Sequence, residues 1–199
     1  MNIAAHKGFA DPVIESQRVF RAVMNALARP GSVQSLQTNL AAPFPLTPTL
    51  AAVALALADQ DAPVWLDQPL RETKAVAEFL RFHTGAPIVD NPSESAFALV
   101  SAADRLPPLD QFAFGTPAFP DRSTTIVLPV GALGQGAAWI LSGPGIAGET
   151  ELRAGPLPDD FAEQWTENNA LFPRGVDLIL AAPGSVAALS RTTKIVRRA

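Results

Sequence analysis

The 199-residue sequence contains no cysteine, no tyrosine and only two histidines. The missing cysteines exclude disulfide bonds, zinc–thiolate sites and any iron–sulfur cluster ligated by this chain. Two histidines, His6 and His83, are too few for a histidine-rich metal site. We therefore expect no metal centre on this chain. His83 is predicted to lie in the last turn of a helix, where the helix dipole favours it, and His6 is predicted to be exposed.

Long apolar runs and clustered basic charge are also missing. The longest apolar run covers residues 50–58, whereas a membrane-spanning helix needs about 20 residues. The net charge is −4, which disfavours general nucleic-acid binding because that requires clustered Lys and Arg. The first ten residues contain no apolar segment typical of a secretory signal. We expect a cytoplasmic protein that binds neither membrane nor nucleic acid.

Apolar residues make up 48 % of the chain, enough for a sizeable core, and 19 prolines punctuate it. We predict a single domain over residues 1–199. Hydrophobic periodicity predicts helices at 12–28, 47–57, 70–84 and 159–171, and strands at 63–66, 96–101, 124–129, 137–141, 149–153 and 176–181. Residues 186–198 are compatible with either a helix or a strand. Glycines 131, 134 and 136 predict a turn that pairs 124–129 with 137–141 antiparallel. The mixture predicts an α/β fold with a mixed sheet and helices on both faces.

The helix predicted at 12–28 has clear start and stop signals. Asp11 is a good N-cap, Pro12 is favoured in a first turn, and the sequence after Ala28 ends the helix with Arg, Pro and Gly. Helical spacing predicts a core-facing stripe formed by Val13, Phe20, Val23, Met24 and Leu27. The opposite face carries Arg18, Arg21, Asn25 and Arg29.

Those arginines form the first candidate binding site. Guanidinium groups match the geometry of phosphate, phosphonate and carboxylate, so Arg18, Arg21 and Arg29 are candidates for binding an anion or a partner protein. The second candidate site is Arg191 with Thr192 and Thr193, inside a C-terminal basic group that also includes Lys194, Arg197 and Arg198. The alternative interpretation of both groups is an ordinary solvated surface.

Known catalytic motifs are absent or incomplete. Residues 143–148 match G-x-G-x-x-G, but dinucleotide binding needs a helix that opens at the last glycine, and a strand is predicted there. We therefore favour a tight turn. Pyridoxal phosphate needs a lysine for its Schiff base, and Lys7, Lys74 and Lys194 lie in a tail, on a polar helix side and near the C-terminus. We predict no pyridoxal phosphate and no catalytic residue.

The order of several short segments resembles the PhnH family of the bacterial carbon–phosphorus lyase system. The resemblance spans nearly the whole chain. It rests on Gly-Phe-Ala-Asp-Pro-Val at 8–13, Ser-Gln-Arg-Val-Phe-Arg at 16–21, Ala-Arg-Pro-Gly at 28–31, Phe-Ala-Leu at 97–99, the loop 115–125, Ser-Gly-Pro-Gly-Ile at 142–146, Phe-Pro-Arg-Gly-Val-Asp-Leu at 172–178 and Arg-Thr-Thr-Lys-Ile at 191–195. Within these segments, Gly143, Gly145 and Asp177 are motif positions in loops.

The resemblance implies both a fold and a biological setting. It implies a three-layer α/β/α fold similar to the large domain of pyridoxal-phosphate-dependent transferases, without the cofactor. It also implies a homodimer that joins PhnG, PhnI and PhnJ in a core complex. With PhnL, that assembly transfers an alkylphosphonate to the ribose of ATP and releases adenine, giving ribose 1-alkylphosphonate 5-triphosphate. PhnJ then cleaves the carbon–phosphorus bond with an iron–sulfur cluster.

Two other interpretations of function remain open at this stage. The chain is expected to be a structural or co-catalytic subunit, because its residues include no recognisable set of nucleophile, base and metal ligands. The first alternative is a stand-alone transferase with a pyridoxal-type fold. The second is a pure scaffold that binds no ligand.

Overall fold

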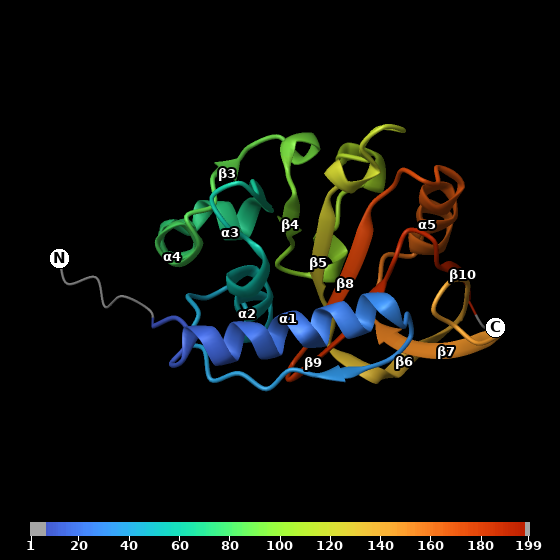
Figure 1. Cartoon of the computed structure of the whole chain (residues 1–199), viewed down its shortest axis with the longest axis horizontal. Coiled ribbons are helices and arrows are strands. Elements are labelled where there is room, and N and C mark those ends of the chain that lie inside the picture. The colour runs from blue at the N-terminus through green and yellow to red at the C-terminus, as the bar shows by residue number, and fades with distance from the viewer. Residues whose placement is uncertain (1–6, 198–199) are drawn as a thin grey trace.

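A central mixed sheet organises the computed structural model, which describes residues 7–197 (Figure 1). Its seven strands lie in the order β1-β9-β8-β5-β4-β2-β3. Strands β3, β2, β4, β5 and β8 run parallel to one another, β9 is antiparallel to β8, and β1 is antiparallel to β9. The strands are β1 (Gln34–Ser35), β2 (Val64–Leu66), β3 (Ile88–Val89), β4 (Phe97–Leu99), β5 (Thr125–Pro129), β8 (Asp177–Ala182) and β9 (Ser185–Leu189).

Each face of this sheet is covered by a different layer. Four helices cover one face: α1 (Pro12–Ala28), α2 (Pro48–Leu57), α3 (Gln68–Glu72) and α4 (Lys74–Thr84). The other face is covered by helix α5 (Phe161–Ala170) and a small antiparallel sheet in the order β10-β6-β7. The strands of the small sheet are β6 (Ala132–Ser142), β7 (Glu149–Gly155) and β10 (Lys194–Arg197). Short 3-10 turns complete the described chain: η1 (Pro92–Glu94), η2 (Ala103–Arg105), η3 (Leu109–Gln111) and η4 (Pro120–Arg122).

Alternation along the central strands separates two hydrophobic cores. In β5, Val127 points into the core beneath the helical layer, whereas Ile126 and Leu128 point into the core beneath α5 and the small sheet. All three side chains are fully buried. A strand that is buried on both faces appears in the sequence as a continuous apolar run, which is why 124–129 was recognisable as a strand.

The mixed α/β class and most of the predicted elements are confirmed, with two corrections. The predicted helix 70–84 is two helices, because Thr73 adopts an extended conformation and its hydroxyl donates a hydrogen bond to the Pro69 carbonyl. The predicted antiparallel pairing of 124–129 with 137–141 is wrong. Strand β5 instead pairs in parallel with β4 and β8, and the glycines at 134 and 136 lie inside β6, where a register shift interrupts its pairing with β7.

Helix α1 has the predicted bounds but not the predicted core-facing side. Its buried residues are Val19, Ala22, Val23 and Ala26. Of the predicted stripe only Val23 is fully buried, while Val13, Phe20 and Met24 are exposed at 79 %, 47 % and 37 %. The buried side packs on α2 and β9 through small residues. Alanines at 51, 52 and 54 of α2 are also buried, so the two helices approach through short side chains.

Two of the candidate residues lie beyond the ends of the described chain. His6 and Arg198 lie outside the described residues. Among those described, no helix has the length and hydropathy that a membrane crossing requires.

Candidate functional site

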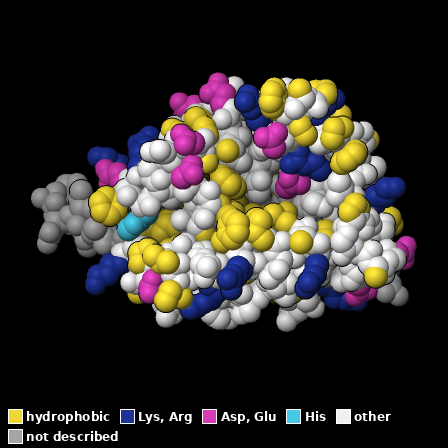
Figure 2. Space-filling view, in the orientation of Figure 1, with side chains coloured by type: hydrophobic (Ala, Val, Ile, Leu, Met, Phe, Trp, Pro, Cys, Tyr) yellow, Lys and Arg dark blue, Asp and Glu magenta, His cyan; other side chains and the backbone are white. Residues whose placement is uncertain are grey.

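The three candidate arginines of α1 lie on the outer surface. Arg18, Arg21 and Arg29 are exposed, as predicted. Within residues 7–197 their guanidinium groups make no ion pair. Figure 2 shows Lys and Arg side chains along this part of the face, below hydrophobic side chains that gather over the middle of the molecule. These arginines therefore contribute little to the stability of the fold, and their charges are available to an external group.

A groove lies beside the start of α1. Its volume is about 1020 Å³, and its walls come from the segment 7–11, the first turns of α1, the segment 37–41 and the end of α4. Arg18 lines it, together with Lys7 and His83. Two carboxylates also line it but serve the helix start: Asp11 accepts a hydrogen bond from the Ile14 amide at 3.0 Å, and Glu15 accepts one from the Asp11 amide at 3.0 Å.

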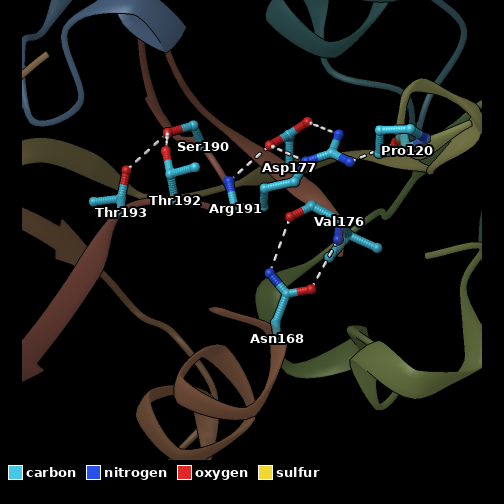
Figure 3. A network of polar contacts seen from close by, with 8 residues as sticks. All are labelled: Pro120, Asn168, Val176, Asp177, Ser190, Arg191, Thr192 and Thr193. Atoms are coloured by element: carbon cyan, nitrogen blue, oxygen red, sulfur yellow. Dashed lines mark hydrogen bonds and ion pairs between the residues drawn. The ribbon is translucent and has the colours of Figure 1, made fainter. Parts of the chain in front are cut away.

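Arg191 has a very different environment from the arginines of α1 (Figure 3). It lies in the turn between β9 and β10, and its guanidinium forms an ion pair with Asp177 at the start of β8. Asp177 Oδ1 also accepts hydrogen bonds from the Arg191 amide at 2.7 Å and from Nε at 3.2 Å. Arg191 Nη1 donates to the carbonyl of Pro120 at 2.6 Å. The two charged side chains are only 15 % and 18 % exposed.

This geometry makes Arg191 a connector between three segments of the chain. Its side chain joins the β9–β10 turn to β8 and to the 3-10 turn η4, which is distant in sequence. Three of its nitrogen atoms donate to partners within the chain, so little of the guanidinium is left for an external anion. The structure thus favours a stabilising function for Arg191, and ligand binding there stays a prediction.

The neighbouring hydroxyl groups are also bonded internally. Ser190 Oγ lies 2.9 Å from Thr192 Oγ1 and 3.0 Å from Thr193 Oγ1. Thr193 is fully buried, and its carbonyl accepts a hydrogen bond from Trp165 Nε1 at 2.8 Å. Asn168 bonds both the amide and the carbonyl of Val176, which precedes β8. The turn is therefore held in place by α5 as well as by β8.

Sequence reasoning missed the contribution of α5 to this turn. Trp165 and Asn168 are buried on α5 and make the hydrogen bonds just described. Asn is a poor residue for a helix interior, and that is the one local signal that pointed to a special position.

The two candidate glycines lie where backbones approach closely. The G-x-G-x-x-G run is the turn of the β6–β7 hairpin, which confirms the tight-turn interpretation. A Cβ on Gly143 would lie 2.9 Å from the Thr192 carbonyl oxygen, and one on Gly145 would lie 2.3 Å from the Ala28 carbonyl oxygen. Both glycines also have positive φ angles. The hairpin turn thus contacts both the Arg191 turn and the end of α1.

The candidates therefore fall into two separate groups. The first, which we call the C-terminal network, comprises Asp177, Ser190, Arg191, Thr192 and Thr193, with Gly143 against it. The second is the outer surface of α1 with its three arginines. Gly145 contacts the helix end next to Arg29, but nothing brings Arg18 or Arg21 to the C-terminal network.

The three candidate lysines for pyridoxal phosphate lie on the surface. Lys74 pairs with Glu78 at 3.4 Å and its side chain is 86 % exposed, and Lys7 and Lys194 are exposed as well. Lys7 borders the groove beside α1, and the absence of pyridoxal phosphate stays a prediction. The described residues also contain no group of three or more His, Asp or Glu side chains arranged to hold a metal ion.

Comparison with known proteins identifies the family. The family described as "Bacterial phosphonate metabolism protein (PhnH)" matches residues 7–196. A relative from Rhizobium meliloti (strain 1021), named "Alpha-D-ribose 1-methylphosphonate 5-triphosphate synthase subunit PhnH", is 47 % identical over 95 % of this chain and 94 % of its own. A relative from Stutzerimonas stutzeri, named "Putative C-P lyase subunit protein HtxG", is 32 % identical over 90 % of this chain and 85 % of its own. With matches that run through both the C-terminal network and α1, this chain belongs to the PhnH family.

Proposed function

We propose that this chain is a subunit of an alpha-D-ribose 1-methylphosphonate 5-triphosphate synthase complex in carbon–phosphorus lyase metabolism. The observation that carries the proposal is the 47 % identity, over nearly the full length of both chains, to a relative named as the PhnH subunit of that synthase. The complex would transfer an alkylphosphonate to the ribose of ATP and release adenine. This chain supports the assembly and supplies none of the reacting groups.

The placement of the charged residues supports a non-catalytic function. Arg191 and Asp177 satisfy each other inside the fold, so neither is poised to act on a substrate. The remaining candidate cations do not line one common cavity: Arg18 borders the groove beside α1, whereas Arg21 and Arg29 are not among its lining residues. Such a surface suits recognition of a partner better than chemistry, because catalysis needs groups that converge on one point.

The proposed partners are the PhnG, PhnI and PhnJ subunits and a second copy of this chain. The fold is proposed to be related to the large domain of pyridoxal-phosphate-dependent transferases. The cofactor is not part of the proposal, since the three lysines lie exposed on the surface. Addition of pyridoxal phosphate should accordingly produce no aldimine absorbance band and no shift in melting temperature.

Reconstitution tests the proposed function directly. Purified chain is mixed with ATP and methylphosphonate, alone and together with the PhnG, PhnI and PhnL proteins, and adenine release and the triphosphate product are measured. The chain alone should release no adenine, whereas the complete mixture should form the product only when this chain is present. Product formation by the chain alone would identify a stand-alone transferase. Full activity of the other subunits without it would reject the proposal.

A further inference from the structure

The outer side of α1 carries a largely apolar row, most of which nothing in the described chain covers. The row comprises Val13, Gln17, Phe20, Met24 and Leu27, and we call it the α1 seam. Its members follow one another at intervals of four, three, four and three residues. Four of the five are apolar. Val13, Phe20 and Met24 are exposed, whereas Leu27 at the end of the row is partly buried against the core beneath the helical layer. Apolar residues at this spacing form the contact line of one helix against another.

A different side of α1 faces the core of the protein. Val19, Ala22, Val23 and Ala26 are buried against α2 and β9. Val13, Phe20 and Met24 are therefore not a poorly packed part of the core, because the helix has a separate core face, to which only Leu27 of the seam also contributes. Figure 1 shows α1 lying across the front of the molecule with its outer side uncovered along its length.

Charge restricts what can cover the seam. At 100° per residue Arg21 lies next to the seam, and Arg18 and Arg29 lie farther round the exposed side of the helix. None of the three makes an ion pair in the described chain, and no Asp or Glu occurs between residues 16 and 29. The protein as a whole has a net charge of −4, so this basic strip contrasts with the remainder of the molecule. Two copies of the chain joined seam to seam would place both arginine rows in one interface with no acidic residue to offset them.

We infer that the α1 seam binds an amphipathic α-helix of a different protein, with apolar residues facing Phe20 and Met24 and acidic residues facing Arg18 and Arg21. This inference rests on the proposed function, because the partner would be another subunit of the same complex. The length of α1 suits it: at about 1.5 Å per residue, the seam from Val13 to Leu27 extends over roughly 21 Å, or two heptads.

Substitutions on the seam test the inference by affinity. Phe20→Ala and Arg21→Glu should each raise the Kd for the partner subunits about tenfold or more, which is the effect expected for a central contact. The loss caused by Arg21→Glu should be larger at low salt, since its origin is electrostatic. Phe172→Ala and Arg105→Glu are matched controls on exposed residues away from α1, and they should change Kd less than about twofold. Melting curves of all four variants confirm that they remain folded.

The absence of cysteine allows a second, direct readout. Gln17→Cys introduces one thiol within the seam, between Val13 and Phe20, and Arg105→Cys introduces one elsewhere. Addition of the partner subunits should slow maleimide labelling of the first about tenfold or more and leave the second unchanged, because only the first thiol becomes covered. Photo-cross-linking from the same thiol should mark partner residues spaced three or four apart, as on one side of a helix.

Each outcome separates this inference from the proposed function. If the unmodified chain copurifies with the other subunits and the seam variants do so equally well, the seam is not the docking site, but the proposed function stands. If the unmodified chain binds none of them, both are rejected. Cross-links between two copies of this chain would show a homodimer contact instead. Binding of the chain alone to anionic lipid vesicles, lost in Phe20→Ala, would show a membrane contact, and either result overturns the inference.

Discussion

Removal of the Arg191 side chain is the sharpest test of how this fold is held together. Arg191→Ala deletes the ion pair to Asp177 and the hydrogen bond to the Pro120 carbonyl. Asp177 would then keep only the hydrogen bond from the amide of residue 191. Breaking a buried ion pair costs about 3–5 kcal/mol. Because these side chains are 15 % and 18 % exposed, water replaces part of the interaction, and we expect a loss of about 2–4 kcal/mol.

The loss should be visible in equilibrium unfolding. Urea titration followed by tryptophan fluorescence gives the free energy of unfolding. For a chain of this size each kcal/mol moves the melting temperature by about 2–4 °C, so Arg191→Ala should melt roughly 4–16 °C lower. Arg191→Lys keeps the charge but loses the planar fork of the guanidinium, so its melting temperature should lie between those of the unmodified chain and Arg191→Ala. A double-mutant cycle with Asp177→Asn should give a coupling energy of about 1–3 kcal/mol.

The control for this experiment is an exposed arginine. Arg18→Ala should change the free energy of unfolding by less than about 0.5 kcal/mol, because its guanidinium has no partner in the described chain. If Arg191→Ala costs no more than Arg18→Ala, the C-terminal network does not stabilise the fold and the reasoning from its geometry is wrong.

Three further predictions concern α1, the hairpin turn and α5. Phe20→Ala should lower the free energy of unfolding by less than about 1 kcal/mol, since Phe20 is half exposed, whereas Val23→Ala on the buried face should lower it by about 2 kcal/mol. Equal losses would mean that Phe20 faces the core, as the sequence alone predicted. Gly145→Ala should destabilise by about 2 kcal/mol or more because its Cβ meets the Ala28 carbonyl, and Gly148→Ala, with a similar φ but open space, should cost only about 1–2 kcal/mol. Trp165→Phe should lower the unfolding free energy by about 1–3 kcal/mol, as the Thr193 carbonyl loses its donor. Urea titration measures all three.

Local signals made α1, α2 and the central strands predictable. Asp11 accepts a hydrogen bond from the Ile14 amide, and Thr47 accepts one from the Leu50 amide, as N-cap residues do. Strands β5 and β8 stood out because they are buried on both faces. These features depend on residues close together in sequence, which is why they were visible without the structure.

The buried side of α1 depends on its neighbours and was therefore not predictable from periodicity. Large apolar residues cover much of the helix, and the stripe of Val13, Phe20 and Met24 has the stronger hydrophobic pattern. The core instead selects Ala22 and Ala26, because short side chains let α1 lie close to the alanines of α2. The stronger stripe is consequently left on the outside.

The pairing of Arg191 with Asp177 follows from strand register. Leu178 pairs with Leu189 across the β8–β9 hairpin, so Asp177, the first residue of β8, lies near the residues that follow β9. The sequence of residues 186–198 is compatible with either a helix or a strand, and without the β8–β9 hairpin nothing places Asp177 next to Arg191. The positive-φ Gly184 at the turn was the available signal.

Three of the segments that carry the family resemblance have a physical explanation within the fold. Residues 28–31, 142–146 and 191–195 meet where Gly143 and Gly145 let backbones approach within a distance that a Cβ would prevent. Residues 16–21 are different, because Arg18, Phe20 and Arg21 are all exposed and contribute little to folding. A half-exposed phenylalanine between two arginines without ion pairs adds little to the packing of a single chain. A contact outside the chain gives these residue types a physical purpose, and an acidic amphipathic helix supplies both the apolar surface and the opposite charge that they lack.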